Sequence, residues 1–495
     1  MAQPSYTALI ALGLLAYAIA HTLYNLYLHP LRTFPGPLLH RASRLPHVYR
    51  LLRGTLATDM LPLHERYGPV VRIAPNELAF SSHQAWKDIY GHKPGGDELP
   101  KSQVFYRTAG VAPSIVAEDK ENHAMLRRLL GVGFSDRSMR EQEPIIGGYV
   151  DLLIKRLGEH CVDRDGKDER TGLQKRRVMN MTAWYNWTTF DIIGDLAFGE
   201  PFGCLDRAEY HPWVSAIGAT IRSSVLLLAA KYFNLGPLLF PLMKRLMKGR
   251  KEHATRTQDK LDRRIEMKNE RADLIAPLIA VKDQLGPDRM RINASTLILA
   301  GSETTATLLT GVTYLLLNNP QTLRRVTEEV RSSFKRDEEI TLLSVGGLSY
   351  MLACLNESLR VYPPVAGGMP RGTYNGEAVI DGHVVPKGTF VAVWQWATNH
   401  WSAHFKNPFS FRPERWMHDP AYASDDLDAV RPFGVGPRDC IGKNLAYAEM
   451  RLILAKVLYN FDMELADKDV DWLNQKAYTL WSKPPLNVYL TPRKV

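Results

Sequence analysis

The segment RPFGVGPRDCIGKNLAYAEMR, residues 431–451, holds one cysteine, Cys440, on a glycine-rich approach to a helix-like pattern. Glycines such as Gly436 and Gly442 let a backbone turn sharply and lie close to a flat ligand. A helix that begins at about Ile441 would direct its positive end at the sulfur and favour the thiolate. A small buried hydrophobe is the commonest role of a free cysteine. A thiolate with no second cysteine or histidine nearby instead suits one axial bond to a haem iron.

A second segment, AGSETTAT at residues 300–307, lies in the middle of an apolar helix predicted over residues 292–317. Serine and threonine can bond the carbonyl one turn back, but a buried carboxylate needs a partner or a raised pKa. Gly301 in a helix interior costs about 1 kcal/mol relative to alanine. These features predict a deformed helix in which Glu303 and Thr304 face a polar cavity. The alternative is a tolerated polar patch.

A third pattern involves Glu357 and Arg360, which are three residues apart in NESLR and share one helical face. Such a pair is usually exposed and worth little. The stretch FRPERW supplies Arg415 in a proline-restricted loop that precedes Cys440. A carboxylate shared between the two arginines would join that loop to the helix and help to shape the cysteine segment.

The elements that must position these residues are mostly helices. Short β-rich pieces lie at residues 69–80, 377–394 and 486–491. The sequence therefore predicts a mainly α fold of the α+β class, with one small sheet region and one large folding unit over residues 38–495. Apolar periodicity places the clear helices at residues 121–134, 144–160, 180–198, 251–271, 292–317, 320–335, 349–361 and 441–459.

Charge and cysteine content restrict the partners. The chain has 495 residues, four well-separated cysteines and a formal net charge of +10. No metal-ligand cysteine spacing or nucleic-acid module is present, so lipid or an acidic protein is the expected partner. Residues 234–251 are apolar and then basic, which fits either a second membrane contact or a solvated helix end.

The N-terminus predicts a membrane anchor. Residues 7–28 contain no charged side chain, and as a helix they span about 33 Å, enough for a bilayer core. Arginines outnumber acids after this segment, which leaves residues 38–495 on the cytosolic side and residues 1–6 in the lumen. Prolines make residues 29–37 a stiff hinge. A cleaved signal peptide is the alternative.

Together these segments make the chain similar to the cytochrome P-450 family. Five residues match its cysteine signature FxxGxRxCxG, and ExxR, PERW and AGSETT match its other motifs. The anchor followed by FPGP resembles the microsomal form, which implies the endoplasmic reticulum membrane. The overall pattern is similar to filamentous-fungal enzymes that tailor secondary metabolites, such as trichothecene hydroxylases. One departure is His123, where many relatives have tryptophan. The signature residues are Phe433, Gly436, Arg438, Cys440 and Gly442.

The resemblance implies haem b, with Cys440 as its axial thiolate ligand and Phe433 packed beside the sulfur. It implies that Glu303 and Thr304 steer protons for oxygen activation, while Glu357, Arg360 and Arg415 are structural. It also implies that the haem propionates are bound by His123, Arg127, Arg371 and Arg438, and that an apolar substrate pocket is lined by Ser114, Ile115, Val116, Ala300, Pro364, Val365 and Leu480.

The resemblance therefore implies a monooxygenase that hydroxylates or epoxidises a small lipophilic substrate. Because the chain has no dinucleotide fingerprint, electrons would come from NADPH–cytochrome P-450 reductase, with cytochrome b5 as a second candidate donor. A haem-thiolate isomerase or dehydratase, a C–C coupling oxidase and a non-catalytic haem-binding membrane protein remain as alternatives. The reductase would dock on the basic face formed by Arg128, Arg137, Arg140 and Lys443.

Overall fold

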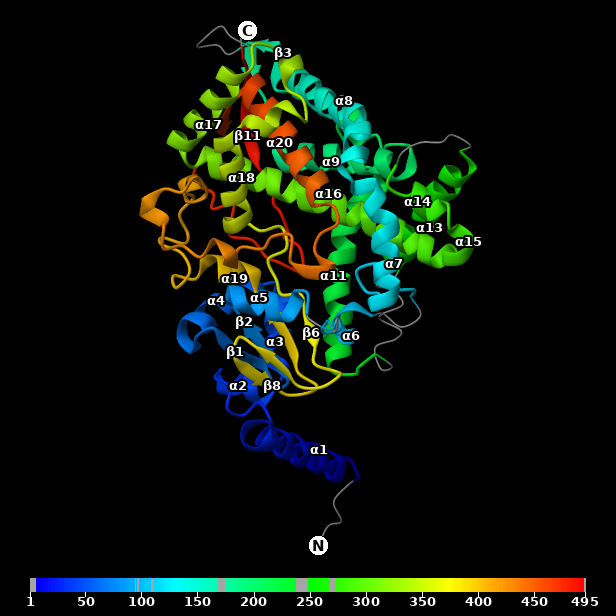
Figure 1. The fold of residues 1–495 in the computed structure, drawn as a ribbon, viewed down its shortest axis with the longest axis vertical. Coiled ribbons are helices and arrows are strands. Elements are labelled where there is room, and N and C mark those ends of the chain that lie inside the picture. The colour runs from blue at the N-terminus through cyan, green and yellow to red at the C-terminus, as the bar shows by residue number, and fades with distance from the viewer. Residues whose placement is uncertain are drawn as a thin grey trace.

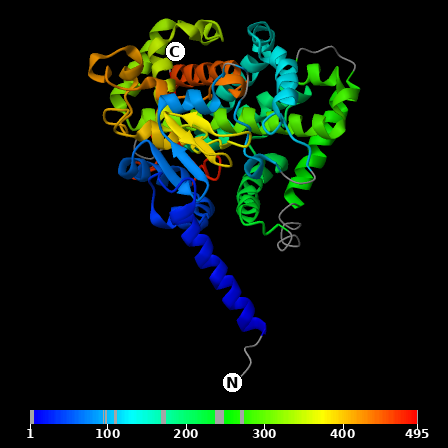
Figure 2. The same ribbon diagram turned by 60° about the horizontal axis from the view of Figure 1, so that its bottom comes forward.

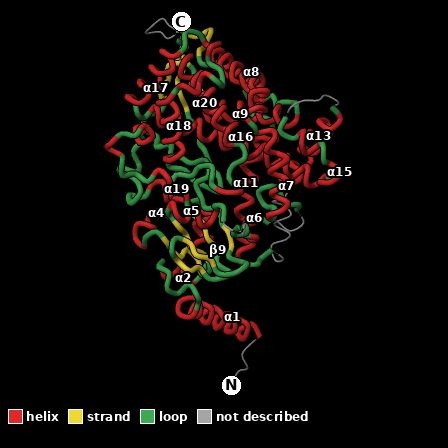
Figure 3. Tube along the Cα trace, viewed as in Figure 1, coloured by secondary structure: helices red, strands yellow, loops and turns green. Residues whose placement is uncertain are grey.

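The computed structural model describes residues 6–93, 95, 98–107, 111–167, 174–236, 248–267 and 273–493. Figure 1 shows a larger helical part and a smaller part that contains the main sheet, near the N-terminal end. Most of the trace in Figure 3 is helical, and the strands gather in small groups. The prediction of a helical majority with a small sheet region is confirmed.

Two long helices form the centre of the helical part. In α9, Met181–Phe198, every residue except Asp195 is buried, and α16, Pro287–Leu317, is buried along its second half. The Tyr185 and Thr313 hydroxyl groups share a hydrogen bond of 2.9 Å between these helices. A Cβ on Gly301 would lie only 2.8 Å from Ile193 Cδ1. Gly301 therefore allows α9 and α16 to pack closely.

Four helices pack around this pair: α8 (Asp136–His160), α17 (Pro320–Ser333), α18 (Ser349–Val361) and α20 (Lys443–Asn460). The predicted helices are confirmed in the described residues, although residues 268–271 of the helix predicted over 251–271 lie outside them. The largest shift is at the start of α8, which begins at Asp136 instead of residue 144 and contains Pro144 in its interior. Helix α16 also begins earlier than predicted, at Pro287 instead of residue 292, because a proline fits the first helical turn. The remaining helices are α2 (Leu38–Ala42), α3 (Leu45–Arg53), α4 (Leu56–Tyr67), α5 (His83–Tyr90), α6 (Gln103–Tyr106), α7 (Lys120–Gly131), α10 (Cys204–Arg207), α11 (Pro212–Tyr232), α13 (Lys248–Glu266), α14 (Ala276–Ile279), α15 (Lys282–Leu285) and α19 (Gln395–His400).

The main sheet has the strand order β1-β2-β9-β6, and β2 pairs with β9 in parallel. A second sheet joins β10, β11 and β5, which brings the end of the chain to the start of α9. The predicted β-rich pieces are confirmed, whereas β3, β4, β5, β6 and β10 were not predicted. The strands are β1 (Val70–Ala74), β2 (Glu77–Phe80), β3 (Val162–Lys167), β4 (Gln174–Arg176), β5 (Val178–Asn180), β6 (Arg371–Gly372), β7 (Ala378–Ile380), β8 (His383–Val385), β9 (Phe390–Val393), β10 (Phe461–Leu465) and β11 (Asn487–Pro492).

At the N-terminus, α1 (Tyr6–Leu23) continues into a short π-helix, Tyr24–Leu28, and projects from the body of the molecule (Figure 2). Within the part of the chain that the structure describes, this is the one helix long and apolar enough to cross a membrane. Its base is fixed, because Asn25 is buried and its Nδ2 donates to the Ala42 carbonyl at 2.9 Å. Most of the second predicted membrane contact, at residues 237–247, lies outside the described residues.

The predicted proline hinge packs against the main sheet. The buried Arg72 of β1 donates from Nη1 to the Asn25 and Leu31 carbonyls at 3.0 and 3.3 Å. Its backbone N–H donates to the Pro35 carbonyl at 2.7 Å. A Cβ on Gly36 would lie 2.3 Å from the Arg72 carbonyl oxygen. Helix α1 is therefore joined to the body by a packed segment.

Candidate active site

The loop before Cys440 turns at two glycines. Gly434 and Gly436 have φ angles of +72° and +78°, a region that glycine adopts without steric cost. A Cβ on Gly436 would lie 2.0 Å from the Tyr90 carbonyl oxygen. The Cys440 N–H donates to the Phe433 carbonyl at 2.8 Å and closes the loop. Cys440 is exposed, whereas the other three cysteines are buried, so the loop presents this sulfur to open space.

Two opposing effects act on the Cys440 thiol. Helix α20 begins at Lys443, two residues later than predicted. Protein atoms that pack around part of the thiol desolvate it and raise the pKa of Cys440, whereas the Gly442 N–H, Arg127 and Lys443 lower it. A coordinated metal cation deprotonates a thiol outright, so an iron bound at this sulfur would add to the second effect.

A cluster of basic side chains surrounds one carboxylate, that of Glu98. Arg438 Nε donates to both Glu98 oxygens at 2.8 and 2.9 Å, and Arg371 Nη1 lies 3.9 Å from Oε2. Lys101 is bridged to Arg371 through the backbone. Burial, together with repulsion from Arg371 and Arg438, holds the pKa of Lys101 well below its usual value. Burial and the Arg438 charge lower the pKa of His123 to about 4, so this ring is neutral near pH 7.

This basic cluster has spare capacity for anions. Arg371 Nε and the Tyr106 hydroxyl are buried without a hydrogen-bond partner among the residues that the structure describes. Buried donors of this kind cost free energy until an acceptor reaches them. One carboxylate, Glu98, also faces both Arg438 and Arg371, so the cluster keeps excess positive charge. The propionates of a porphyrin are carboxylate acceptors of the kind that these buried donors lack. The residues present therefore fit haem, with Cys440 as the axial ligand.

Arg127 is engaged elsewhere in this structure. Its Nη1 donates to the Asp439 carbonyl at 2.6 Å, and its guanidinium forms an ion pair with the Asp439 carboxylate. This contact holds α7 against the residue that precedes Cys440. On the other side of the loop, the Phe433 ring lies 5.2 Å from that of Tyr447. The cysteine loop is therefore supported by both α7 and α20.

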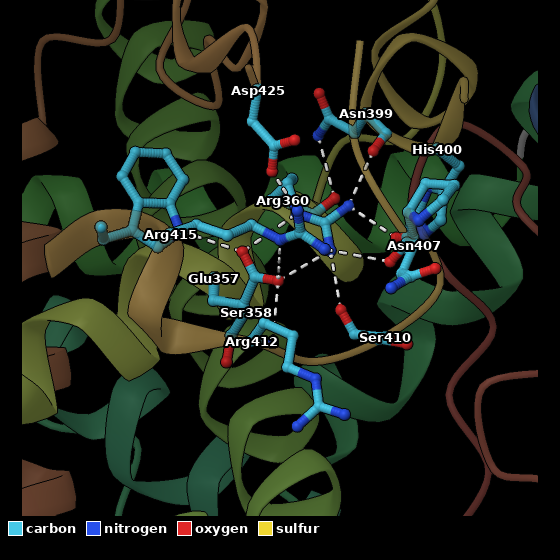
Figure 4. Close-up of polar contacts among 12 residues, drawn as sticks. Glu357, Ser358, Arg360, Asn399, His400, Asn407, Ser410, Arg412, Arg415 and Asp425 are labelled. Atoms are coloured by element: carbon cyan, nitrogen blue, oxygen red, sulfur yellow. Dashed lines mark hydrogen bonds and ion pairs between the residues drawn. The ribbon is translucent and has the colours of Figure 1, made fainter. Parts of the chain in front are cut away.

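The structure places Glu357 between Arg360 and Arg415, and all three side chains are fully buried (Figure 4). Glu357 Oε1 accepts from Arg360 Nη2 at 2.7 Å and from Arg415 Nε at 3.1 Å. Its Oε2 accepts from Trp416 Nε1 at 3.0 Å. The expected sharing of one carboxylate by two arginines is present. Arg360 also donates to the backbone carbonyls of Asn399, Pro408 and Ser410.

The ion cluster around Glu357 lies close to the cysteine loop. A cavity beside it is lined on one side by Asn356 and Trp416 and on the other by Phe433 and Tyr447. The Tyr447 hydroxyl donates to Asn356 Oδ1 at 2.9 Å, which links α20 to α18. The buried ion cluster and this hydrogen bond together fix the approach of the loop to α20.

In α16, the AGSETT segment forms a continuous helix. Thr304 Oγ1 donates to the Ala300 carbonyl at 2.7 Å, as expected for a threonine inside a helix. The helix is unbroken at Gly301, and this glycine makes room for α9. Glu303 forms an ion pair with Lys483, whose Nζ lies 2.8 Å from Oε2.

The residues predicted to line a substrate pocket come from segments that the structure joins in pairs. The Ile115 N–H donates to Asn293 Oδ1 at 2.8 Å, which ties the 114–116 loop to α16. Trp481 Nε1 donates to the Pro363 carbonyl at 2.8 Å, which brings the Leu480 segment to the Pro364 segment. Ala300 is exposed although α16 is central, so this helix borders open space at that residue.

Sequence reasoning missed three charged residues near these groups, namely Glu98, Lys101 and Lys483. Glu98 meets Arg438, which is 340 residues away along the chain, and Lys483 meets Glu303, which is 180 residues away. Neither belongs to a periodic pattern or a local motif. Only the folded arrangement brings them to the site.

An exposed cysteine on a glycine loop, next to a buried basic cluster with spare donors, fits a haem-thiolate protein. A family model described as cytochrome P-450 matches residues 35–491. The chain is 47% identical over 495 residues to the cytochrome P-450 monooxygenase tpeC of Talaromyces stipitatus, covering 99% of this chain and 95% of the relative.

Two further relatives are named for their substrates. The averantin hydroxylase of Dothistroma septosporum is 44% identical over 97% of this chain and 90% of its own length. The trichothecene C-15 hydroxylase of Fusarium sporotrichioides is 43% identical over 97% of this chain and 96% of its own length. The chain belongs to the cytochrome P-450 family. It is a haem-thiolate monooxygenase, similar to monooxygenases of fungal secondary metabolism.

Proposed function

We propose that this enzyme hydroxylates or epoxidises a small lipophilic fungal secondary metabolite, with electrons from NADPH that arrive through NADPH–cytochrome P-450 reductase. The similarity to hydroxylases of averantin and of trichothecenes, over nearly the whole chain, carries this proposal. The residues expected to line the pocket are mostly apolar, which suits a lipophilic molecule. Anchoring through α1 would place the enzyme on the cytosolic face of the endoplasmic reticulum.

In this proposal Cys440 holds the haem iron, and the haem supplies the oxygen activation that the protein cannot provide. Arg371 and Arg438 bind the propionates, assisted by the neutral ring of His123. Arg127 supports the loop through Asp439 and is also expected to bind the propionates. Phe433 packs beside the sulfur, and Gly442 gives its N–H to it.

Proton supply in this proposal falls to Glu303 and Thr304. The Thr304 hydroxyl donates a hydrogen bond to the Ala300 carbonyl. Its oxygen is therefore oriented and can accept a hydrogen bond from another donor. The Glu303 carboxylate lies one residue away and is partly exposed. A carboxylate that borders water can collect protons and pass them on through ordered water.

Reductase docking in this proposal uses four basic residues that are all exposed: Arg128, Arg137, Arg140 and Lys443. Arg137 also pairs with Glu141 at 3.0 Å, but 86% of its side chain remains exposed. Complementary charge speeds the encounter of two proteins and fixes their orientation. Lys443 begins α20, so a partner bound there would lie close to the Cys440 loop.

The test begins with a carbon monoxide difference spectrum of the reduced membrane protein, compared with Cys440→Ala and with Cys161→Ala as a matched control. We expect a red-shifted Soret band in wild type and in the control, and its loss in Cys440→Ala. Microsomes with reductase and NADPH are then supplied with fungal metabolite extracts and profiled by mass spectrometry. Products that gain one oxygen atom in wild type alone support the proposal. A histidine-type band, or no oxygenated product, would overturn it.

A further inference from the structure

The C-terminal hairpin 477–481 is a fixed and locally strained structure. Ala477 bridges Trp481, and the Tyr478 N–H donates to the Leu480 carbonyl at 2.9 Å. Between them Thr479 has φ of +96°, which is strained for any residue with a Cβ and is held only where the surroundings impose it. The surrounding structure therefore holds the tip of the hairpin in a strained conformation. The residues that follow the hairpin have a fixed backbone position at their start.

Trp481 anchors the hairpin to the centre of the molecule. Its indole N–H donates to the Pro363 carbonyl at 2.8 Å, and its ring stacks on Tyr362 with centroids 5.1 Å apart. Both Trp481 and Tyr362 are buried. This anchor lies two residues before Lys483, so the backbone of Lys483 has little freedom to move.

Lys483 reaches from this anchor into α16 and α9. Its Nζ donates to Glu303 Oε2 at 2.8 Å, to Thr307 Oγ1 at 2.9 Å and to Asn186 Oδ1 at 3.3 Å. The three donors of the ammonium group thus meet three acceptors. The Lys483 side chain is 5% exposed and that of Glu303 is 15% exposed. A nearly buried ion pair therefore joins the C-terminal segment to the two central helices.

The pair also decides how Glu303 is oriented. Oε2 is held by Lys483, whereas Oε1 makes no hydrogen bond to any residue that the structure describes. The hydrogen-bond network extends further, because Asn186 Nδ2 donates to the Tyr210 hydroxyl at 3.2 Å. Tyr210 is 38% exposed. Glu303 is thus fixed through one oxygen, its other oxygen meets no donor among the described residues, and Thr304 is the next residue along α16.

A buried ion pair is weak evidence for stability alone, because desolvation offsets much of its attraction. We propose that Lys483 is a positioning residue for proton delivery, which fixes the Glu303 carboxylate so that its free oxygen serves the proton path at Thr304. This inference rests on the proposed function of Glu303. Lys483 touches neither substrate nor cofactor in this assignment and acts only through Glu303.

The proton path has a measurable stoichiometry. Two electrons and two protons convert dioxygen into hydrogen peroxide, whereas four electrons and four protons convert it into two waters. NADPH supplies two electrons in each hydride transfer. A Glu303 carboxylate that is out of place delays the proton that commits dioxygen to water, so more of the NADPH consumed appears as hydrogen peroxide.

The experiment uses the full-length, haem-loaded enzyme in lipid nanodiscs with reductase, without added substrate. The variants are Lys483→Met, which removes the charge, Lys483→Arg, which retains it, and Lys476→Met, an exposed lysine of the same segment. We expect Lys483→Met to raise hydrogen peroxide released per NADPH several-fold. Lys483→Arg should return the ratio close to wild type, and Lys476→Met should leave it unchanged. Lys483→Gln replaces Lys483→Met if that variant does not take up haem.

A second measurement does not depend on turnover. Thermal unfolding of wild type, Lys483→Met, Glu303→Gln and the double variant forms a double-mutant cycle. We expect the second substitution to cost less in the presence of the first, because each removes the same ion pair. The role of Lys483 would be overturned if the two losses of stability were additive and the peroxide ratio were unchanged, in an enzyme whose carbon monoxide spectrum is normal. A wild type without the thiolate spectrum would instead overturn the proposed function itself.

Discussion

The charge of one buried carboxyl group illustrates how local surroundings set chemistry at the residue scale. Glu449 lies on α20, is 1% exposed and is buried beside α16. Burial raises the pKa of Glu449 to about 8, and a hydrogen bond with Thr305 opposes the rise. Its Oε2 has no hydrogen-bond partner among the described residues. Glu449 is therefore a neutral acid inside the folded protein at pH 7.

This neutral acid predicts a pH dependence of stability. The folded state holds the Glu449 proton up to about pH 8, whereas the unfolded chain releases it above about pH 4.3. Since the folded state holds this proton and the unfolded chain does not, the contribution of Glu449 to stability falls as pH rises from about 5 to about 8. Glu449→Gln should lose this decline. Thermal midpoints measured across the window test it, with the exposed Glu328→Gln as control, and parallel curves for wild type and Glu449→Gln would contradict it.

The buried ion cluster of Figure 4 gives a second prediction. Glu357→Gln keeps the shape of the side chain but removes the charge shared by Arg360 and Arg415, which are both fully buried. Removing one partner of a buried ion pair costs about 3–5 kcal/mol. We expect a strongly lowered thermal midpoint and little haem uptake. The exposed Glu328→Gln on α17 serves as control, and a midpoint equal to that of wild type would show that the cluster contributes no net stability.

Sequence alone indicated some of these residues and missed others for a physical reason. Glu357 and Arg360 are three residues apart, so helix geometry itself predicts their contact. Arg415 was assignable because prolines confine its loop. Glu98 and Lys483 carry no such local signal, since their partners are distant in the chain. The sequence also could not show how burial raises the pKa of Cys440, because desolvation depends on atoms that only the fold brings near.

At the scale of elements, the cysteine loop depends on two glycines with different surroundings. Both Gly434 and Gly436 have positive φ. A Cβ on Gly434 would meet its nearest atom at 3.7 Å, whereas one on Gly436 would lie 2.0 Å from a backbone oxygen of Tyr90. The two positions therefore share the same conformational strain, and only Gly436 adds a collision with α5.

This difference makes a matched pair of variants. Gly434→Ala should cost roughly 1–2 kcal/mol through its left-handed backbone and retain the thiolate-type carbon monoxide spectrum. Gly436→Ala must also displace the end of α5, so we expect most of the haem-thiolate signal to be lost. The signal per unit of purified protein measures both. Equal signals in the two variants would show that the contact with Tyr90 does not shape the loop.

The predicted helices were accurate because their apolar periodicity is long and their caps are local. The close neighbour of Gly301 was not predicted, because a glycine in a helix can indicate either a deformation or a close approach. Only the packing of Ile193 distinguishes the two. Strand β5, Val178–Asn180, was not predicted, since a three-residue strand is defined by its partner β11 and hardly by its own sequence.

At the scale of the whole molecule, the residues at the base of α1 pack as part of the protein body. Deletion of residues 2–20 removes most of α1 and keeps Asn25, whereas deletion of residues 2–29 also removes the carbonyl that Arg72 binds. A lost hydrogen bond to a charged group costs about 1.5–3 kcal/mol. We expect both proteins to leave the membrane more easily, and only the longer deletion to lower the thermal midpoint. Equal midpoints would show that the contact adds no stability.

The sheet formed by β10, β11 and β5 has a consequence for biosynthesis. Strand β5 is made before most of the helical part, yet its partner β11 follows only after helices α9 to α20 have been made. A growing chain therefore carries an unpaired strand edge during most of its translation, which invites pairing with other chains. We expect a stop codon before β11 to give a membrane-bound chain that cellular quality control removes. A truncated enzyme with reduced activity should not accumulate.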